Sequence, residues 1–180
     1  MKAPLFILFP LICTLHADVS QKLFDLYQKG LYANGCDYGY KFFAQNTQNE
    51  SFVSLLGFSC LKADQIDRLA PVISALQETR DGRANSTYFA LLLMQKKLLM
   101  QALYDNKPLT NLTFPASSHL LSKVFDFYLK NPKAADMIKE YPDPQNPRQS
   151  YRLYTTEING KKSIAIDEYY DKILSLHHVY

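Results

Sequence analysis

The stretch Leu55-Leu56-Gly57-Phe58-Ser59-Cys60-Leu61, followed by Arg68-Leu69-Ala70-Pro71-Val72-Ile73-Ser74-Ala75-Leu76, decides the fold of this chain. In both segments the apolar residues recur at the three- and four-residue spacing of a helix with one buried face. A short break, Ala63-Asp64-Gln65, separates the two segments. Amphipathic helices joined by so short a break pack as an antiparallel hairpin. The sequence therefore predicts a hairpin whose second helix covers about residues 65–77.

A copy of this pattern lies just before it, and a partial copy lies just after it. Four apolar pairs are each 33 residues apart: Tyr27 and Cys60, Cys36 and Leu69, Tyr40 and Ile73, Phe43 and Leu76. Ala90 and Leu93 keep this offset from Gly57 and Cys60, but no break follows near Lys97. A constant offset is the signature of a structural repeat. We therefore expect stacked helix hairpins, with the periodicity ending in a long helix over about 85–104.

Residues 23–102 resemble the tetratricopeptide-repeat family and its cysteine-bearing bacterial relatives. The resemblance depends on residues at the spacing of that family's packing positions: Val53, Leu56, Gly57, Cys60, Leu69, Ile73 and Leu76. It implies a mainly α fold of stacked antiparallel helix hairpins. For function it implies protein or peptide binding.

Length and composition exclude some classes of protein. The chain has 180 residues, 47% of them hydrophobic, which is enough for a packed core and too apolar for wholesale disorder. Its formal net charge is only +3, and no run of Lys and Arg exceeds two residues. A nucleic-acid-binding surface needs clustered basic residues. We therefore expect no nucleic-acid partner.

The N-terminus has the features of a secretory signal peptide. Lys2 is followed by an apolar run of about a dozen residues and then by His16-Ala17. The run is shorter than the roughly 20 residues that span a bilayer. We predict that residues 1–17 are removed after Ala17, leaving a periplasmic or secreted chain without a membrane span. An uncleaved anchor or a buried helix is the alternative.

Removal of the signal peptide would also remove Cys13 and leave two cysteines, Cys36 and Cys60. In an oxidising compartment such a pair is expected to form a disulfide. Two reduced thiols that fill buried repeat positions are the alternative.

After Tyr141 the sequence pattern changes from helical periodicity to a linker and then to the alternation that is typical of strands. Helices are expected over about 117–130 and 133–141, which closes a helical-repeat domain of residues 18–141. Three prolines mark a linker at 142–150. Residues 151–168 then alternate around Asn159-Gly160, which predicts a β-hairpin. In its register Glu157 faces Lys162, Thr155 faces Ile164, Leu153 faces Ile166 and Arg152 faces Asp167. Within the remainder of 151–180, residues 173–180 form a third strand or 169–178 form a helix.

No group of residues predicts catalysis, a cofactor or a metal. The mature chain holds three histidines, His119, His177 and His178, and no cysteine or carboxylate spacing completes a zinc site around them. His119 is better explained as a helix cap beside Ser117 and Ser118. Tyrosines are more numerous than one small core requires, and tyrosine is favoured at protein interfaces. Five of them are the candidate protein-binding residues: Tyr32, Tyr38, Tyr40, Tyr169 and Tyr170. Packing of these tyrosines in the core is the alternative.

These observations favour a non-catalytic adaptor that binds another envelope or periplasmic protein. By analogy of fold, it would be an accessory part of an assembly such as a secretion system or the flagellar motor. Two other classes stay open. A secreted hydrolase or carbohydrate-active enzyme would need a deep pocket with two convergent titratable groups. A small-ligand-binding protein would need an enclosed apolar cavity.

Overall fold

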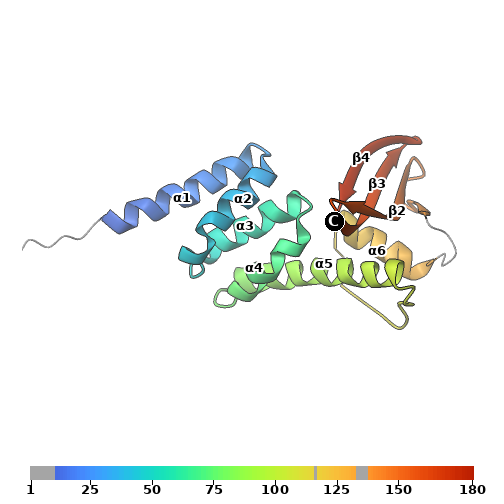
Figure 1. Ribbon diagram of the computed structural model, residues 1–180, viewed down its shortest axis with the longest axis horizontal. Coiled ribbons are helices and arrows are strands. Elements are labelled where there is room, and N and C mark those ends of the chain that lie inside the picture. Colours follow the sequence, from blue (N-terminus) through green and yellow to red (C-terminus); the bar gives the residue numbers. More distant parts are fainter. Residues whose placement is uncertain (1–10, 116, 133–137) are drawn as a thin grey trace, which may run out of the picture.

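The computed structural model describes residues 11–115, 117–132 and 138–180, with side chains from Asp18 onward. The described chain is mainly helical and ends in a four-stranded antiparallel sheet. Its helices are α1 (Leu11–Gln28), α2 (Tyr32–Phe42), α3 (Glu50–Lys62), α4 (Leu69–Ala75), α5 (Arg80–Tyr104) and α6 (Leu120–Lys130), with 3-10 turns η1 (Phe43–Gln45) and η2 (Ile66–Arg68). Its strands are β1 (Ile138–Pro142), β2 (Gln149–Ile158), β3 (Lys161–Tyr170) and β4 (Ile173–Val179). The sheet lies at the opposite end of the molecule from α1 (Figure 1).

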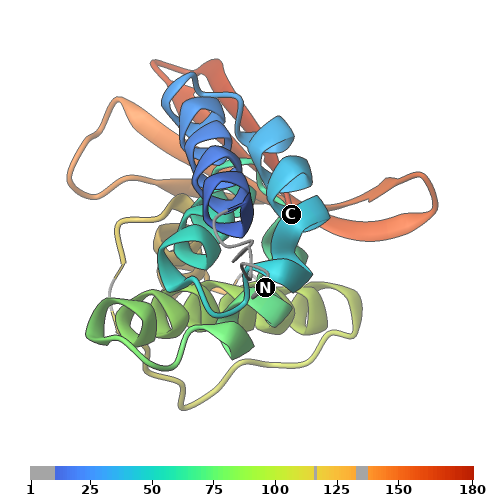
Figure 2. The same ribbon diagram turned by 90° about the vertical axis from the view of Figure 1, so that its left-hand side faces the viewer.

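Helix α3, which contains the central LLGFSCL segment, is the hub of the helical part. It contacts α1, α2, α4 and α5. In Figure 2, α1 and α2 lie side by side, and α5 runs beneath them at the bottom of the view. Gly57 allows this close packing, because a Cβ added there would lie 2.4 Å from Cε2 of Phe89 on α5 and 2.9 Å from Cγ1 of Val72 on α4. The mid-helix glycine is thus explained by the approach of two neighbouring helices.

A disulfide joins α2 to α3. Cys36 and Cys60 are bonded, with Cα atoms 4.7 Å apart, and neither side chain is exposed. This is the pairing that the sequence predicts. It connects the first helix pair to the central one. The helix α2 begins at Tyr32 and includes Gly35, which packs against Ser59 of α3.

The start of α5 differs from the prediction. We expected the helix to begin near Asn85, but it begins at Arg80, and the Thr79 hydroxyl accepts the Gly82 N–H as its N-cap. Glu50 of α3 supports this turn by accepting the N–H groups of Gln77, at 2.5 Å, and Thr79, at 2.8 Å. The Thr79 hydroxyl and these backbone bonds lower the pKa of Glu50 to about 2. A carboxylate supplied by another helix therefore sets the first turn of α5, which local sequence could not reveal.

The second helix of the central hairpin is also shorter than predicted. The single helix expected over 65–77 is a 3-10 turn, η2, followed by the seven residues of α4. Pro71 is the third residue of α4. At that position a helix needs no intrahelical N–H donor, so the proline is accommodated without a kink.

The C-terminal sheet has the strand order β1-β2-β3-β4, and all neighbouring strands are antiparallel. The predicted hairpin is confirmed with its register: Glu157 pairs with Lys162, Thr155 with Ile164, Leu153 with Ile166 and Arg152 with Asp167. The third-strand alternative for the C-terminus is also confirmed, as β4. The helix considered over 169–178 is wrong.

Strand β1 was not predicted. We expected a helix over 133–141, but residues 138–141 are extended and pair with β2, while 133–137 lie outside the described residues. Tyr141 faces Tyr151 across the pair and is only 4% exposed. Pairing with the edge of β2 has thus overridden the helical preference of a short segment. The linker predicted at 142–150 contains the last residue of β1 and the first two of β2.

Candidate protein-binding groove

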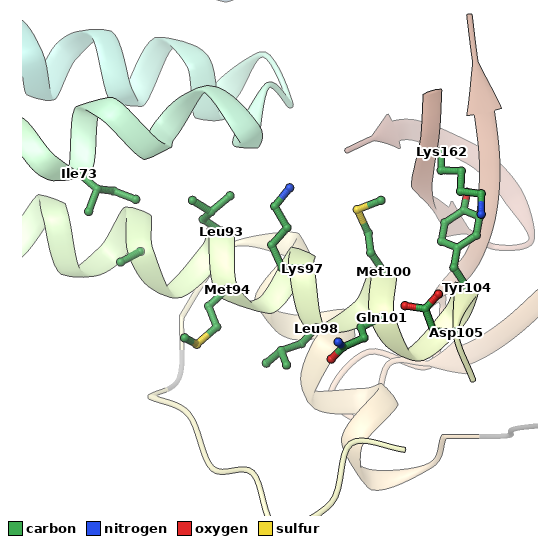
Figure 3. Close-up of a pocket in the computed structure, with 11 residues that line it drawn as sticks. Ile73, Leu93, Met94, Lys97, Leu98, Met100, Gln101, Tyr104, Asp105 and Lys162 are labelled. Carbon is green, nitrogen blue, oxygen red and sulfur yellow. The ribbon is translucent and has the colours of Figure 1, made fainter. Parts of the chain in front are cut away.

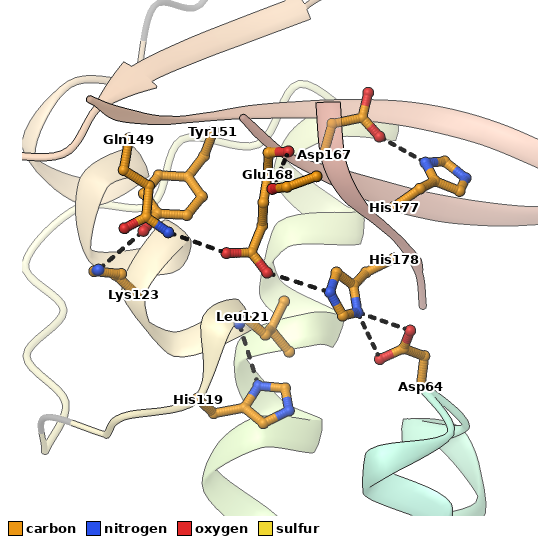
Figure 4. A network of polar contacts seen from close by, with 11 residues as sticks. Asp64, His119, Leu121, Lys123, Gln149, Tyr151, Asp167, Glu168, His177 and His178 are labelled. Carbon is orange, nitrogen blue, oxygen red and sulfur yellow. Dashed lines mark hydrogen bonds and ion pairs between the residues drawn. The ribbon is translucent and has the colours of Figure 1, made fainter. Parts of the chain in front are cut away.

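His119, His177 and His178 have different partners, and His178 joins the sheet to the helical part. His178 of β4 lies between two carboxylates, with Nδ1 2.9 Å from Asp64 after α3 and Nε2 3.4 Å from Glu168 of β3 (Figure 4). Hydrogen bonds to Asp64, then to Glu168, raise the pKa of His178 to about 9. His177 points to the other side of the sheet and pairs with Asp167 at 2.6 Å.

His119 has the opposite electrostatic character. Its Nδ1 accepts the N–H of Leu121 at 3.2 Å, so it caps α6, as expected from the sequence. Burial lowers the pKa of His119 to about 4. The seam between helices and sheet thus contains one charged histidine, His178, and one neutral histidine, His119, at neutral pH.

This pair predicts a stability maximum near pH 6.5. His178 stabilises the fold fully below its unfolded pKa of 6.5, and that contribution is lost as the pH rises towards 9. His119 contributes fully above 6.5, and its contribution is lost as the pH falls towards 4. Tm measured between pH 4 and pH 9 should therefore be highest near pH 6.5 and should fall on both sides of this value. H178N should reduce the fall in Tm above pH 6.5. H119N, which keeps a capping oxygen, should reduce the fall in Tm below pH 6.5. Unchanged pH slopes in both variants would contradict this assignment.

A groove of about 740 Å³ runs along one side of α5 (Figure 3). Most of its floor is a stripe of α5 residues spaced three or four apart, flanked by Ile73 of α4 at one end and Lys162 of β3 at the other. The stripe consists of Ala90, Leu93, Met94, Lys97, Leu98, Met100, Gln101 and Tyr104 of α5, followed by Asp105 at its C-cap. Met94 is 54% exposed. The groove is therefore a largely apolar surface that is open to solvent and shared by the helical part and the sheet.

The opposite side of α5 is the one that the core uses. Phe89, Leu92, Leu99 and Ala102 are buried there, and Gln95 is hydrogen-bonded to Ser122 of α6 at 3.1 Å. The helix is thus apolar on two sides: one is buried in the core, and the other is only partly covered, with Met94 its most exposed apolar residue.

Lysines surround one side of the groove. Asp67 of η2 receives Lys96 and Lys97 at 2.7 Å each and Lys161 at 3.2 Å. Burial opposes ionisation of Asp67, but the hydrogen bonds from these lysines hold its pKa well below the ordinary value. Lys162 lies 5.0 Å from the centre of the Tyr104 ring. One carboxylate therefore balances only part of the positive charge on this side.

Tyr104 fixes the far end of the groove to the sheet. Its hydroxyl lies 2.7 Å from the carbonyl oxygen of Thr156 and 2.8 Å from that of Ser163, and it accepts the Ser163 N–H at 3.1 Å. These bonds connect the last turn of α5 to β2 and β3. The two parts of the groove wall are consequently held in a fixed relation.

The five tyrosines that the sequence singles out do not form one surface. Three lie on α2, where Tyr40 donates to the Arg68 carbonyl and its ring lies 4.2 Å from the Arg68 guanidinium. Tyr32 packs against Tyr27 and Tyr38 against Phe42. The α2 tyrosines therefore contribute in part to packing within the helical array.

The other two, Tyr169 and Tyr170, are the last two residues of β3. Arginine side chains stack on both: Arg152 lies 4.7 Å from the Tyr169 ring and Arg148 lies 4.3 Å from the Tyr170 ring. Tyr170 pairs with the exposed Ile173 of β4. No tyrosine of the predicted set lines the α5 groove.

Sequence reasoning missed the groove residues, although a signal was present. Leu93, Met94 and Leu98 add a second apolar stripe to a helix whose first stripe, through Leu92 and Leu99, already supplies a core face. A surface helix needs one apolar face only. The excess indicates either two covered faces or one binding face, and the sequence does not distinguish between them.

In the part of the chain that the structure describes, no three His, Cys, Asp or Glu side chains are grouped to hold a metal ion. None of the described helices has both the length and the apolar character that crossing a bilayer requires. Comparison with protein-family models, with curated proteins and with solved structures found no match to this chain.

Proposed function

We propose that this protein is an exported, non-catalytic adaptor that binds a segment of another envelope protein in the α5 groove. The observation that carries the proposal is the apolar stripe from Ala90 to Tyr104, which is only partly covered on a helix whose other side is buried in the core. Large exposed apolar surfaces rimmed by polar residues are typical of protein-binding sites. Lys97 and Lys162, which are exposed and line the groove, provide such a rim.

The position of the groove supports a repeat arrangement of tetratricopeptide type. Gly57 of α3 is covered by Val72 of α4 and Phe89 of α5. Ala90, which lies 33 residues further along the chain, lines the groove instead. In this interpretation α5 opens a third helix pair, and the groove occupies the place where a further helix of the array would pack.

Export is part of the same proposal. The disulfide between Cys36 and Cys60 suits an oxidising compartment, as the signal-peptide pattern of residues 1–17 requires. The proposed cleavage site after Ala17 lies within α1, so the mature protein would keep this helix from Asp18 to Gln28. A periplasmic or secreted protein of this kind would serve an envelope assembly, such as a secretion system or the flagellar motor.

The proposal is tested by placing a photo-crosslinking amino acid at Met94 in the cells that make the protein. Irradiation should join the protein to a small, reproducible set of envelope proteins, identified by mass spectrometry. The same amino acid at Phe24, which is exposed on α1, is the matched control and should not capture that set.

A variant pair provides the second readout. M94E should reduce recovery of the captured partner at least about tenfold, because a carboxylate would then lie on the apolar floor. Its Tm should be unchanged, since Met94 is mostly exposed. F24E should retain the partner. Loss of the partner with F24E alone would move the site to α1 and α2, and an absence of any capture at Met94 would contradict binding in the groove.

A further inference from the structure

We infer that the occupant of the α5 groove is an amphipathic α-helix of a partner protein, with Asp and Glu residues along the edge that meets the lysine rim. This inference rests on the proposed function and specifies its ligand. Shape, backbone chemistry and charge each support it.

The shape of the groove fits a helix. The stripe from Ala90 to Asp105 covers 15 residue steps of α5, which at about 1.5 Å per residue is roughly 22 Å, or four turns. Its members recur every three or four residues, the spacing with which one helix meets another through ridges and grooves. A partner helix of about four to five turns would cover the whole stripe.

Backbone chemistry favours a helix over an extended peptide. An extended segment needs hydrogen-bond partners for its own N–H and C=O groups. The wall that α5 provides offers few, because the backbone groups within a helix are bonded to one another. A helix brings its backbone groups already paired and needs only side-chain contacts, which Leu93, Met94 and Leu98 can supply.

The protein itself provides a precedent for this mode of packing. At Gly57, which precedes Ala90 by the repeat offset, α3 receives the helix α4 through Val72. The occupant would make the equivalent contact with α5 and so complete the third helix pair from outside the chain.

Charge decides the polar edge of the occupant. Four lysines lie in or beside the groove, Lys96, Lys97, Lys161 and Lys162, against the two carboxylates Asp67 and Asp105. Glu157, which pairs with Lys162 across β2 and β3, adds a third carboxylate, so four positive charges against three negative ones leave a net charge of +1 around the site. Lys97 and Lys162 are exposed and line the groove, so carboxylates of a bound helix can reach them. Complementary charge steers association and sets orientation.

The test uses the purified, disulfide-bonded protein and three labelled peptides of about 18 residues, or five turns. The first has leucine and alanine on one helical face and glutamate on the other. The second replaces every glutamate with lysine, and the third scrambles the first so that it has no apolar face. Binding is measured by fluorescence anisotropy, and helix formation on binding by circular dichroism.

The acidic amphipathic peptide should bind as a helix, at least about tenfold more tightly than the lysine and scrambled peptides. K97Q/K162Q should weaken its binding about tenfold, whereas the matched double variant K29Q/K41Q, at exposed positions just after α1 and on α2, should not. M94E should abolish it. Raising NaCl from about 50 to about 500 mM should weaken binding to the parent protein but not to K97Q/K162Q.

Three results would overturn the inference: no binding of the acidic peptide, equal or tighter binding of the lysine peptide, or binding that M94E leaves unchanged. The proposed function is decided separately by capture at Met94 in cells. Capture of a partner segment without carboxylates, or one that binds as an extended chain, would retain the groove as a binding site and reject the acidic helix.

Discussion

G57V is expected to lower the free energy of unfolding by at least about 3 kcal/mol. A Cβ at this position would lie 2.4 Å from Cε2 and 2.7 Å from Cζ of Phe89, and 2.9 Å from Cγ1 of Val72. Because α4 and α5 both approach α3 here, no single side chain can move away to relieve the contacts. The measurement is urea unfolding followed by circular dichroism. G57A should have a smaller effect, since alanine regains part of the loss through its higher helix propensity.

Two controls connect the effect to the helix contact. A84V places the same side chain at an exposed position of α5 and should cost less than about 1 kcal/mol. In a double-mutant cycle, F89A should make room for the valine, so G57V/F89A should lose clearly less stability than the sum of the single variants. Additive losses, or a G57V protein within 0.5 kcal/mol (about the error of such cycles) of the parent, would contradict the close approach.

The second large effect is expected from the disulfide. Replacing both cysteines, as C36A/C60A, should lower the free energy of unfolding by about 3 kcal/mol, because the bridge closes a loop with a sequence separation of 24. Both side chains are fully buried, so alanine avoids placing a polar group in the core. All proteins compared should carry C13S, which leaves no third thiol for exchange.

Reduction supplies the control for this prediction. Dithiothreitol should shift the urea midpoint of the parent protein towards that of C36A/C60A and leave the double variant unchanged. A parent protein with the same midpoint in both redox states would show that the bridge does not contribute to stability. The effect has a clear structural meaning, since this bond connects α2 to the central helix α3.

Local pattern was sufficient wherever the partners in a contact lie close in sequence. The hairpin of β2 and β3 is an example: the Asn159-Gly160 turn has positive φ at both residues, and this short turn fixes every cross-strand pair that follows. The helices of the central segment were predicted for the same reason. The pairing of Cys36 with Cys60 followed from a count of the cysteines that lie outside the predicted signal peptide.

Prediction failed where a distant partner set the local structure. The first turn of α5 depends on Glu50, which lies 29 residues before the capping Thr79. Residues 138–141 became a strand because β2 offered an edge to pair with, although their sequence suits a helical turn. A single sequence contains the preference of each segment, but not the competing contacts that override it.

For the α5 groove, what the sequence determines and what the tertiary structure decides can be separated clearly. The sequence by itself determined the helices around LLGFSCL, the pairing of Cys36 with Cys60 and a β-hairpin of defined register. It also determined that α5 is apolar on two sides. Only the tertiary structure decided which side is the core and which is the groove, because burial depends on where α6 and the sheet pack. The lysine rim has the same origin: Asp67, Lys97 and Lys161 are far apart in sequence, and folding brings them to one edge of the groove.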